Sequence, residues 1–305
     1  MVAFLFAGQG SQYIGMGKGL YEAFPESRAV FDRAEKALGL ELKKRTFEGP
    51  EDLLKITTVS QPAILTVSIA ALEALKTKTS LKPVFMAGLS LGEYSALVAA
   101  GSLTLEDGVR LVKKRSEIMN EAAAKNPGKM AAVLDLPFEK VKEVCLKSEA
   151  EIANLNAPGQ IVISGSALAV EQAKDLCLKE GAKRVIELEV SGGFHSRLML
   201  GASVELKEVL ESTSFAVPEV PVVSNYTARP ESRINQIREN LVYQMYSPVR
   251  WEESIRFMLA QGVTKFFEFG PGKVLKGLMR RIDSNARVTS IENKEDILRT
   301  EEDAS

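Results

Sequence analysis

The stretch of sequence that decides the fold is PVFMAGLSLGE, residues 83–93. Its first half is a short apolar run that predicts a buried strand, and its second half places Gly88, Ser90 and Gly92 in the pattern G-x-S-x-G. Residues 93–100 are compatible with a helix. Glycines at these positions permit a tight strand-to-helix turn that presents the serine hydroxyl at the edge of a sheet. The stretch therefore predicts an α/β protein with a nucleophilic serine, and a glycine-serine loop without chemistry is the alternative interpretation.

The composition of the 305-residue chain limits the classes of protein to which this turn can belong. Hydrophobic residues make up 45% and charged residues 26%, which is typical of a globular protein. The net charge of −1 provides no basic field for nucleic acid or for an anionic membrane. We expect no apolar run to approach the roughly 20 residues that a membrane helix needs.

The cysteine and histidine counts narrow the kinds of site further. Two cysteines, Cys145 and Cys177, exclude a disulfide framework and predict packing residues in a reducing cytoplasm. The single histidine, His195, excludes any site built from two histidines, and no bound metal or cofactor is expected.

Apolar runs and glycine-rich breaks predict a large α/β domain that is split by an insertion. Residues 2–7 form the first expected strand, and they are too short and lack the basic lead that a signal peptide needs. Between residues 129 and 189 the expected order is strand, helix, strand, strand, helix, strand, which is the ferredoxin-like plan. The expected parts are a large subdomain (residues 1–126 and 192–292), a small subdomain (residues 127–191) and a charged, frayed tail (residues 293–305).

The candidate base for the serine is His195, because a serine hydroxyl is a weak nucleophile until a neighbouring group accepts its proton. It lies in the glycine-rich segment SGGFHS, residues 191–196, where the chain returns to the large subdomain. Serine before histidine is the order found in α/β-hydrolases. No acid that could orient the imidazole is visible, since Asp135 and Asp175 fall in the insertion. Something other than a carboxylate is expected to orient it, and a lone surface or core histidine is the alternative interpretation.

Arg115 is the second candidate, because it lies at the middle of an apolar helix face. A buried guanidinium is costly unless it meets an anion, and arginine pairs bidentately with carboxylates. We expect that anion to be a free carboxylate of the substrate. An internal ion pair with Asp or Glu, or an arginine that reaches the rim of the protein, is the alternative. The apolar arc around it contains Leu111, Val112, Ile118, Met119 and Ala122.

The third feature is the loop GQGSQ, residues 8–12, which follows the first strand. It begins like a dinucleotide-binding fingerprint, but Tyr13 occupies the position where G-x-G-x-x-G needs its third glycine. The interpretation we prefer is that backbone N–H groups of this loop face the nucleophile. The loop would then supply the second donor to an oxyanion, beside the N–H of Leu91 at the start of the helix.

Five motifs in this order resemble the family of malonyl-CoA:acyl carrier protein transacylases, acyltransferases of fatty-acid and polyketide synthesis. Each motif is weak alone, but five in register are specific, and the resemblance extends to about residue 292. It implies a hydrolase-like parallel-sheet core with an inserted ferredoxin-like α+β subdomain. The motifs are GQGSQ (residues 8–12), GLSLGE (residues 88–93), Arg115, FHS (residues 194–196) and SPVRW (residues 247–251).

The resemblance also implies the catalytic roles. Ser90 would be the acylated nucleophile, and His195 would act first as general base and then as general acid. The backbone N–H groups of Gln9 and Leu91 would form the oxyanion hole. Arg115 would bind the carboxylate of the malonyl group.

Three further positions take their expected roles from the resemblance. The main-chain carbonyl of Gln244 would orient His195, which would explain the missing acid. Asn156 would line the entrance from the small subdomain. Phe194 matches malonyl-selective members, whereas relatives that use methylmalonyl units tend to carry a smaller residue there.

The chain departs from the family at two positions. Leu89 precedes the nucleophile where the family often has histidine, and this changes the polarity of the pocket but removes no base. Gly193 stands where proline is common, and it is expected to loosen the loop that carries His195.

The implied function is ping-pong transfer of a malonyl group from malonyl-CoA to the phosphopantetheine thiol of acyl carrier protein, for fatty-acid synthesis. The expected protein is a cytoplasmic monomer with no nucleic-acid or membrane partner and no cofactor beyond the coenzyme A thioester that it uses as substrate. A serine esterase or thioesterase, a polyketide-pathway acyltransferase and a non-catalytic carrier-binding module are the alternatives. Patches that could dock an acidic carrier protein are residues 43–45, residues 183–184, and Lys273, Lys276, Arg280 and Arg281.

Overall fold

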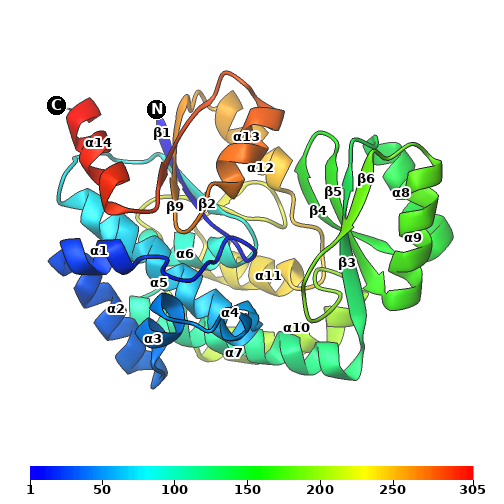
Figure 1. The fold of residues 1–305 in the computed structure, drawn as a ribbon, viewed down its shortest axis with the longest axis horizontal. Coiled ribbons are helices and arrows are strands. Elements are labelled where there is room, and N and C mark those ends of the chain that lie inside the picture. Colours follow the sequence, from blue (N-terminus) through cyan, green and yellow to red (C-terminus); the bar gives the residue numbers. More distant parts are fainter. Residues whose placement is uncertain (305) are drawn as a thin grey trace.

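The computed structural model describes residues 1–304 and arranges their strands in two sheets (Figure 1). The larger sheet is parallel except for its last strand, β8, which runs antiparallel to β7. This confirms the parallel-sheet α/β core. In spatial order its strands are β10 (Arg287–Ile291), β9 (Lys265–Phe269), β1 (Val2–Phe6), β2 (Phe85–Gly88), β7 (Val222–Val223) and β8 (Pro230–Glu231).

Strand β1 lies at the centre of this sheet, between β9 and β2. Four of its five residues are buried, as expected for a parallel strand that helices cover on both faces. Its last residue, Phe6, is in register with Gly88 at the end of β2 and with Phe269 at the end of β9. The carboxyl ends of the three strands therefore meet at one edge, where the Gly8 loop and the serine turn begin.

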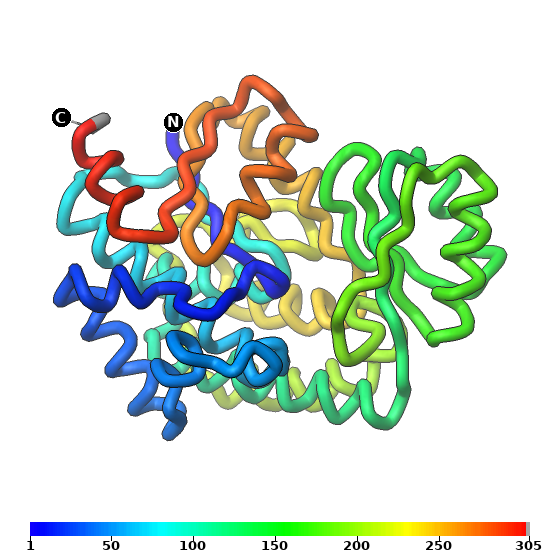
Figure 2. Tube along the Cα trace, in the orientation of Figure 1, coloured from blue at the N-terminus to red at the C-terminus, as the bar shows by residue number. Residues whose placement is uncertain are grey.

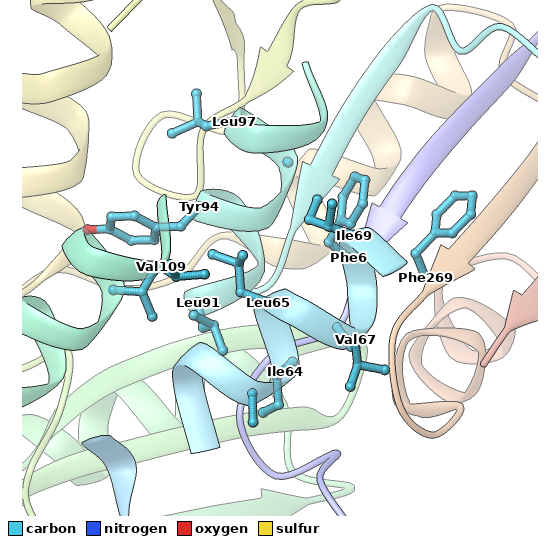
Figure 3. Packing of buried hydrophobic residues seen from close by; sticks show 14 of the residues in the cluster. Phe6, Ile64, Leu65, Val67, Ile69, Leu91, Tyr94, Leu97, Val109 and Phe269 are labelled. Carbon is cyan, nitrogen blue, oxygen red and sulfur yellow. The ribbon is translucent and has the colours of Figure 1, made fainter. Parts of the chain in front are cut away.

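Helices cover both faces of the larger sheet. Leu65 of α5, Leu91 of α6 and Val109 of α7 meet in one core (Figure 3). The helices of this part are α1 (Lys18–Ala23), α2 (Pro25–Leu38), α3 (Leu42–Phe47), α4 (Glu51–Lys55), α5 (Thr57–Lys76), α6 (Leu91–Ala99), α7 (Leu105–Lys125), the 3-10 helix η1 (Arg197–Met199), α10 (Leu200–Ser212), α11 (Ile234–Gln244), α12 (Trp251–Ala260), α13 (Val274–Ile282) and α14 (Lys294–Ala304).

Helix α5 corrects one expectation from the sequence. Its 20 residues, with a mean hydropathy of 1.4 in the most apolar window, are long and apolar enough to cross a membrane, whereas we expected no run to approach that length. In the fold, however, 89% of that window is buried inside the protein. Helix α5 is therefore a core helix, apolar because α1, α2, α6 and α7 surround it.

The smaller sheet is formed by residues 128–187 and is antiparallel throughout. Its order, β4-β5-β3-β6, together with one helix after β3 and one after β5, confirms the ferredoxin-like plan. Figure 1 shows it as a lobe beside the larger sheet. Its elements are β3 (Gly128–Leu134), α8 (Phe138–Ser148), β4 (Glu151–Ala157), β5 (Gln160–Ser166), α9 (Ala167–Lys179) and β6 (Arg184–Glu187).

The smaller lobe has a hydrophobic core of its own, which contains both cysteines. Burial raises the pKa of the Cys145 thiol to about 12 and that of the Cys177 thiol to about 11. Both thiols are unpaired and stay protonated at neutral pH, as expected of packing residues. The exact division of the chain at residues 126/127 and 191/192 stays a prediction.

The two lobes are connected by the chain itself and by contacts that include two backbone hydrogen bonds and an ion pair between Arg281 and Asp135. The chain enters the small lobe after α7 and leaves it after β6 (Figure 2). In addition, Leu155 on β4 donates a backbone hydrogen bond to Val249 at 2.9 Å, and Val249 donates one to Ala153 at 2.9 Å. Strand β4 is thereby held against the segment that precedes α12, and this fixes the position of the small sheet beside the large one.

Where the sequence predicts a frayed tail at residues 293–305, the structure has helix α14. Ile297 is fully buried, and the Asn293 side chain accepts a hydrogen bond from the backbone N–H of Asp296 at 3.0 Å. One buried apolar side chain and one capping contact therefore order a segment whose charge suggested fraying. Residue 305 lies outside the described residues.

Candidate active site

The turn after β2 requires both glycines of G-x-S-x-G. A Cβ atom on Gly88 would lie 2.0 Å from the carbonyl group of Gly92, and a Cβ on Gly92 would lie 2.2 Å from the carbonyl oxygen of Phe6. Ser90 itself has φ 52° and ψ −101°, a backbone conformation that side-chain-bearing residues rarely adopt. Close packing of helix α6 on strands β1 and β2 thus forces the strained turn that exposes the Ser90 hydroxyl.

Asn225, just after β7, holds this turn in place. Its side-chain oxygen accepts a hydrogen bond from the backbone N–H of Ser90 at 2.6 Å, and its side-chain nitrogen donates to the Gly88 carbonyl at 2.8 Å. Asn225 is fully buried. No pattern in the sequence points to this residue, because it lies 135 positions from Ser90 in a short loop without a motif.

His195 lies within hydrogen-bond distance of the serine. Its Nε2 is 2.8 Å from Ser90 Oγ, and its Nδ1 is 2.7 Å from the main-chain oxygen of Gln244. A carbonyl oxygen can only accept, so Nδ1 must carry the proton, and in the neutral ring Nε2 must be the acceptor. The expected contact with a main-chain carbonyl in place of an acid is therefore present, and it selects the tautomer that can take a proton from the serine.

The surroundings keep this imidazole neutral. Burial lowers the pKa of His195 to about 4, and the positive charge of Arg115 lowers it further, while the hydrogen bond to Gln244 acts in the opposite direction. At neutral pH the ring is therefore uncharged and able to accept a proton.

Arg115 is fully buried, with 0% of its surface exposed, and its guanidinium points at the serine. Its Nη2 donates to Ser90 Oγ at 3.2 Å and to the side-chain oxygen of Gln244 at 3.1 Å. Among residues 1–302, whose side chains the structure describes, no Asp or Glu forms an ion pair with it. The alternative of an internal ion pair is thus absent from the described chain, and neutral amides are the partners of a buried cation beside the nucleophile.

A second glutamine, which the sequence analysis missed, binds the other terminal nitrogen of this cation, whose Nε has no hydrogen-bond partner among the described residues. Gln61 on α5 accepts from Arg115 Nη1 at 2.9 Å and donates to the side-chain oxygen of Gln9 at 3.0 Å. Gln9 in turn donates to Thr57 at 3.4 Å. Gln61 is the one buried amide of α5, whose other buried residues are apolar or carry small hydroxyl groups, and this contrast could have identified it.

The two expected oxyanion donors come from the serine turn and from the loop that packs against it. Leu91 is the first residue of α6, where a backbone N–H has no acceptor within the helix. Gln9 belongs to the loop after β1, which packs against the turn so closely that a Cβ on Gly8 would lie 2.5 Å from the Leu89 carbonyl oxygen. The structure therefore places the Gln9 loop directly against the serine turn that carries the Leu91 N–H.

A cleft of about 490 Å³ opens above these groups, between the serine turn and the small sheet. Asn156 of β4 lines it, and its buried Oδ1 has no hydrogen-bond partner among the described residues. Phe194 and Leu89 also line it, and the aromatic ring beside His195 is buried. The cleft brings the predicted residue Asn156 to the same space as Ser90 and His195.

Gly193 is more tightly packed than expected. A Cβ at this position would lie 2.9 Å from the Gly165 carbonyl oxygen and 2.9 Å from the Leu198 side chain. The Gly193 carbonyl also accepts a hydrogen bond from the Ser196 hydroxyl at 2.6 Å. The segment before His195 is thus held by close contacts, and the absence of proline does not leave it loose.

Comparison with known proteins identifies the family of this chain. Residues 3–292 match the family described as acyl transferase domain. Malonyl CoA-acyl carrier protein transacylase of Bacillus subtilis is 50% identical over 301 residues, which cover 97% of this chain and 95% of the relative. The solved acyl-carrier-protein S-malonyltransferase of Bartonella henselae is 42% identical, with a TM-score of 0.96 over 99% of both chains.

A third similar structure is a malonyl-transacylase in complex with a type II polyketide synthase acyl carrier protein. It is 39% identical to this chain, with a TM-score of 0.96 and coverage of 99% of each chain. The identities are high, and the alignments span nearly the whole length of every chain compared. The chain therefore belongs to the acyl transferase family, among its malonyl-CoA:acyl carrier protein transacylases.

Proposed function

We propose that this transacylase transfers malonyl groups by a ping-pong mechanism through an ester on Ser90. One observation carries the proposal: the Ser90 hydroxyl lies 2.8 Å from a neutral imidazole and 3.2 Å from a buried guanidinium that forms no direct ion pair with an acid in the described chain. A base beside a hydroxyl activates a nucleophile. A cation beside it can hold a substrate that carries a carboxylate.

In the first half-reaction Ser90 Oγ attacks the thioester carbonyl of malonyl-CoA, and His195 Nε2 takes the hydroxyl proton. The oxygen that becomes negative is stabilised by the backbone N–H groups of Gln9 and Leu91. When the tetrahedral intermediate collapses, the bond to sulfur breaks and the coenzyme A thiol leaves with the proton from His195. The malonyl group remains as an ester on Ser90.

In the second half-reaction the phosphopantetheine thiol of acyl carrier protein gives its proton to His195 and attacks the ester. The bond to Ser90 Oγ breaks, and the serine regains its proton from the imidazolium. A carrier protein as acceptor is supported by the similar transacylase that was solved with its carrier. The thioester brings an already activated acyl group, so these steps call for no cofactor.

Selectivity for malonyl groups is assigned to Arg115 and Phe194. The carboxylate would take bidentate hydrogen bonds from the guanidinium, whereas an acetyl group would leave the buried cation unpaired. The buried ring of Phe194 would fill the space beside the α-carbon, against a methyl branch. Asn156 would line the entrance for the rest of the thioester.

The setting of the reaction is also proposed. One chain supplies every group that the proposed site needs, in agreement with a monomer. Two unpaired cysteines agree with a reducing cytoplasm, where the reaction would supply extender units for fatty-acid synthesis. Of the three basic patches, the α13 face is the one we favour for carrier docking, because Val274 and Leu278 of α13 line the cleft.

Intact mass after brief exposure to malonyl-CoA tests the proposal. We expect a malonyl adduct that maps to Ser90 and disappears when acyl carrier protein bearing phosphopantetheine is added, with malonyl-carrier as the product. Rapid loss of the adduct in water alone would indicate a thioesterase. Normal function of Ser90→Ala would indicate a binding module.

The same assay tests the assigned selectivity. Arg115→Ala is expected to lose the preference for malonyl-CoA over acetyl-CoA while Ser90 can still be acylated. If the variant kept its preference, the carboxylate-binding role of Arg115 would be refuted.

A further inference from the structure

Glu93 is a buried carboxyl group that the proposed reaction leaves without a role. It lies on α6, three residues after Ser90, and 3% of its surface is exposed. Its Oε2 accepts hydrogen bonds from the side chain of Gln244 at 2.7 Å and from the backbone N–H of Asn225 at 3.0 Å. No Lys or Arg among residues 1–304 forms an ion pair with it, which is unusual for a buried acid.

One amide connects this carboxyl group to the cation of the site. The Gln244 side chain donates to Glu93 through its nitrogen and accepts from Arg115 through its oxygen, at 3.1 Å. Without substrate, the charges of an ionised Glu93 and of Arg115 cancel within this buried cluster. A malonyl carboxylate that pairs with Arg115 adds one negative charge that no described residue balances.

We propose that Glu93 takes up one proton from solvent when the malonyl carboxylate binds against Arg115, so that charge in the site stays balanced. The inference rests on the proposed role of Arg115. Protonation removes the unbalanced charge, because a neutral carboxylic acid is far less costly to bury than a second anion.

The geometry accommodates both protonation states of Glu93. The two N–H donors, from Gln244 and Asn225, converge on the same oxygen, Oε2. Oε1 receives neither of them, and a proton bound there leaves both hydrogen bonds intact. The amide that contacts Arg115 therefore keeps its orientation whether or not Glu93 is charged.

The titration of Glu93 agrees with this role. Burial raises its pKa to about 7, while hydrogen bonds from Asn225, Gln244 and Ser224 and the positive charge of Arg115 lower it. Either form is therefore accessible near neutral pH. Three titratable or charged groups surround it, namely Tyr94 beside it on α6, Arg115 of α7, and His195 beyond Gln244.

Proton uptake during a single turnover tests the proposal directly. The full chain is mixed with malonyl-CoA in a dilute buffer that contains a pH indicator, and coenzyme A release is measured in parallel. With a pKa near 7 before binding, we expect uptake of about half a proton per coenzyme A at pH 7 and of nearly one at pH 8. No uptake by the wild-type protein would overturn the proposal.

Two carboxyl variants identify the group that takes up the proton. Glu93→Gln keeps an oxygen for the two donors but cannot titrate, and it is expected to abolish the uptake. The matched control is Glu268→Gln, since Glu268 is the other fully buried acid and caps α13 through the N–H groups of Leu275 and Lys276, away from Gln244. Uptake that persists in Glu93→Gln, or that is lost only in Glu268→Gln, would contradict the assignment.

A steady-state measurement on the wild-type protein keeps the test valid if Glu93→Gln does not fold. Because binding takes up a proton, KM for malonyl-CoA should rise up to tenfold per pH unit above pH 7. A flat KM from pH 7 to 9 would overturn the inference. Arg115→Ala distinguishes a failure of this inference from a failure of the proposed function. If Arg115→Ala loses the preference for malonyl-CoA but the wild-type protein takes up no proton, only the role of Glu93 is refuted. If Arg115→Ala keeps the preference, the roles of Arg115 and Glu93 are both refuted.

Discussion

The two walls of the cleft differ in how their polar groups are satisfied. On the wall that carries the serine turn, hydrogen bonds connect one polar side chain to the next, from Ser90 through Arg115 to Gln244 and Glu93. On the small-sheet wall half of the lining side chains are apolar, no hydrogen bond connects the polar ones to the serine, and Oδ1 of Asn156 is buried without a partner in the described chain. The apolar residues on that wall are Met130, Ala132 and Val162.

This difference separates residues that act on the reacting groups from residues that only bind the substrate. A connected network is preorganised even though Arg115 Nε lacks a partner in the described chain, so removing one member leaves others unsatisfied and changes the reacting groups. An unpartnered atom on a wall that makes no contact with the reacting groups is available to a ligand, and its removal changes binding alone. Substitutions on the first wall should therefore reduce turnover or selectivity, and those on the second should change KM.

The largest effect is expected for Ser90→Ala on the first wall. Without the hydroxyl there is no acyl-enzyme, and transfer to acyl carrier protein should fall by at least about 10⁴-fold. Malonyl-carrier formation followed by mass spectrometry measures this, with thermal unfolding as the control for folding. Transfer at more than a hundredth of the wild-type rate would contradict a serine ester as intermediate.

Gln244→Glu should have the next largest effect, because it places a carboxylate where an amide oxygen now lies 3.1 Å from Arg115 Nη2. The new carboxylate would pair directly with the guanidinium before substrate arrives, while Glu93, now opposite a second carboxyl group, would hold a proton. The preference for malonyl-CoA over acetyl-CoA should therefore fall by about 10²- to 10³-fold. The ratio of the two kcat/KM values measures it. Asn235→Asp, which adds the same charge at an exposed position of α11, is the matched control.

The pH dependence of kcat tests the protonation state of His195, on the wall that carries the serine turn. With a pKa of about 4, His195 stays a neutral base at pH 5, whereas an imidazole at the ordinary value of 6.5 would lose roughly 30-fold in rate there. We expect kcat to be level from pH 5 upward. Because the chain has one histidine, a single imidazole NMR resonance reports the titration, and a midpoint near 6.5 would contradict this.

The lowered pKa of His195 also affects the free energy of unfolding. The direction of this effect depends on whether the folded or the unfolded chain binds the proton at the higher pH. The folded pKa of His195 lies below the unfolded one, so the unfolded chain takes up the proton more readily. This group's contribution is therefore complete above pH 6.5 and is lost as the pH falls from there towards 4. Glu93 acts in the opposite sense, because its folded pKa of about 7 exceeds the unfolded value of 4.5, and its contribution is lost as the pH rises through 7.

The features that could be predicted from the sequence are those determined by residues close together in the chain. The serine turn depends on Gly88 and Gly92, which are close in sequence to Ser90, and Arg115 is identified by its place in one helix period. The small lobe was predictable because strands and helices alternate within a short segment. In each case the deciding contacts, or the pattern that reports them, lie within a few turns of chain.

What could not be predicted depends on residues that meet only in the fold. Gln61 contacts Arg115 from 54 positions away, and Asn225 supports Ser90 from 135 positions away, with no motif around either. The edge strand β10 and helix α14 were missed because their polarity is mixed and one buried face decides them. Long-range packing, rather than local preference, determines these features.

The smallest effect is expected on the second wall, from Asn156→Ala. If Oδ1 accepts a hydrogen bond from the thioester arm, its loss should raise KM for malonyl-CoA by about tenfold and leave kcat unchanged. Removing a buried oxygen that lacks a partner should not lower the unfolding temperature of the free protein. Thermal denaturation of the same preparation checks this. A fall in kcat with unchanged KM would place Asn156 in the chemistry instead, and the division between the two walls would then be wrong.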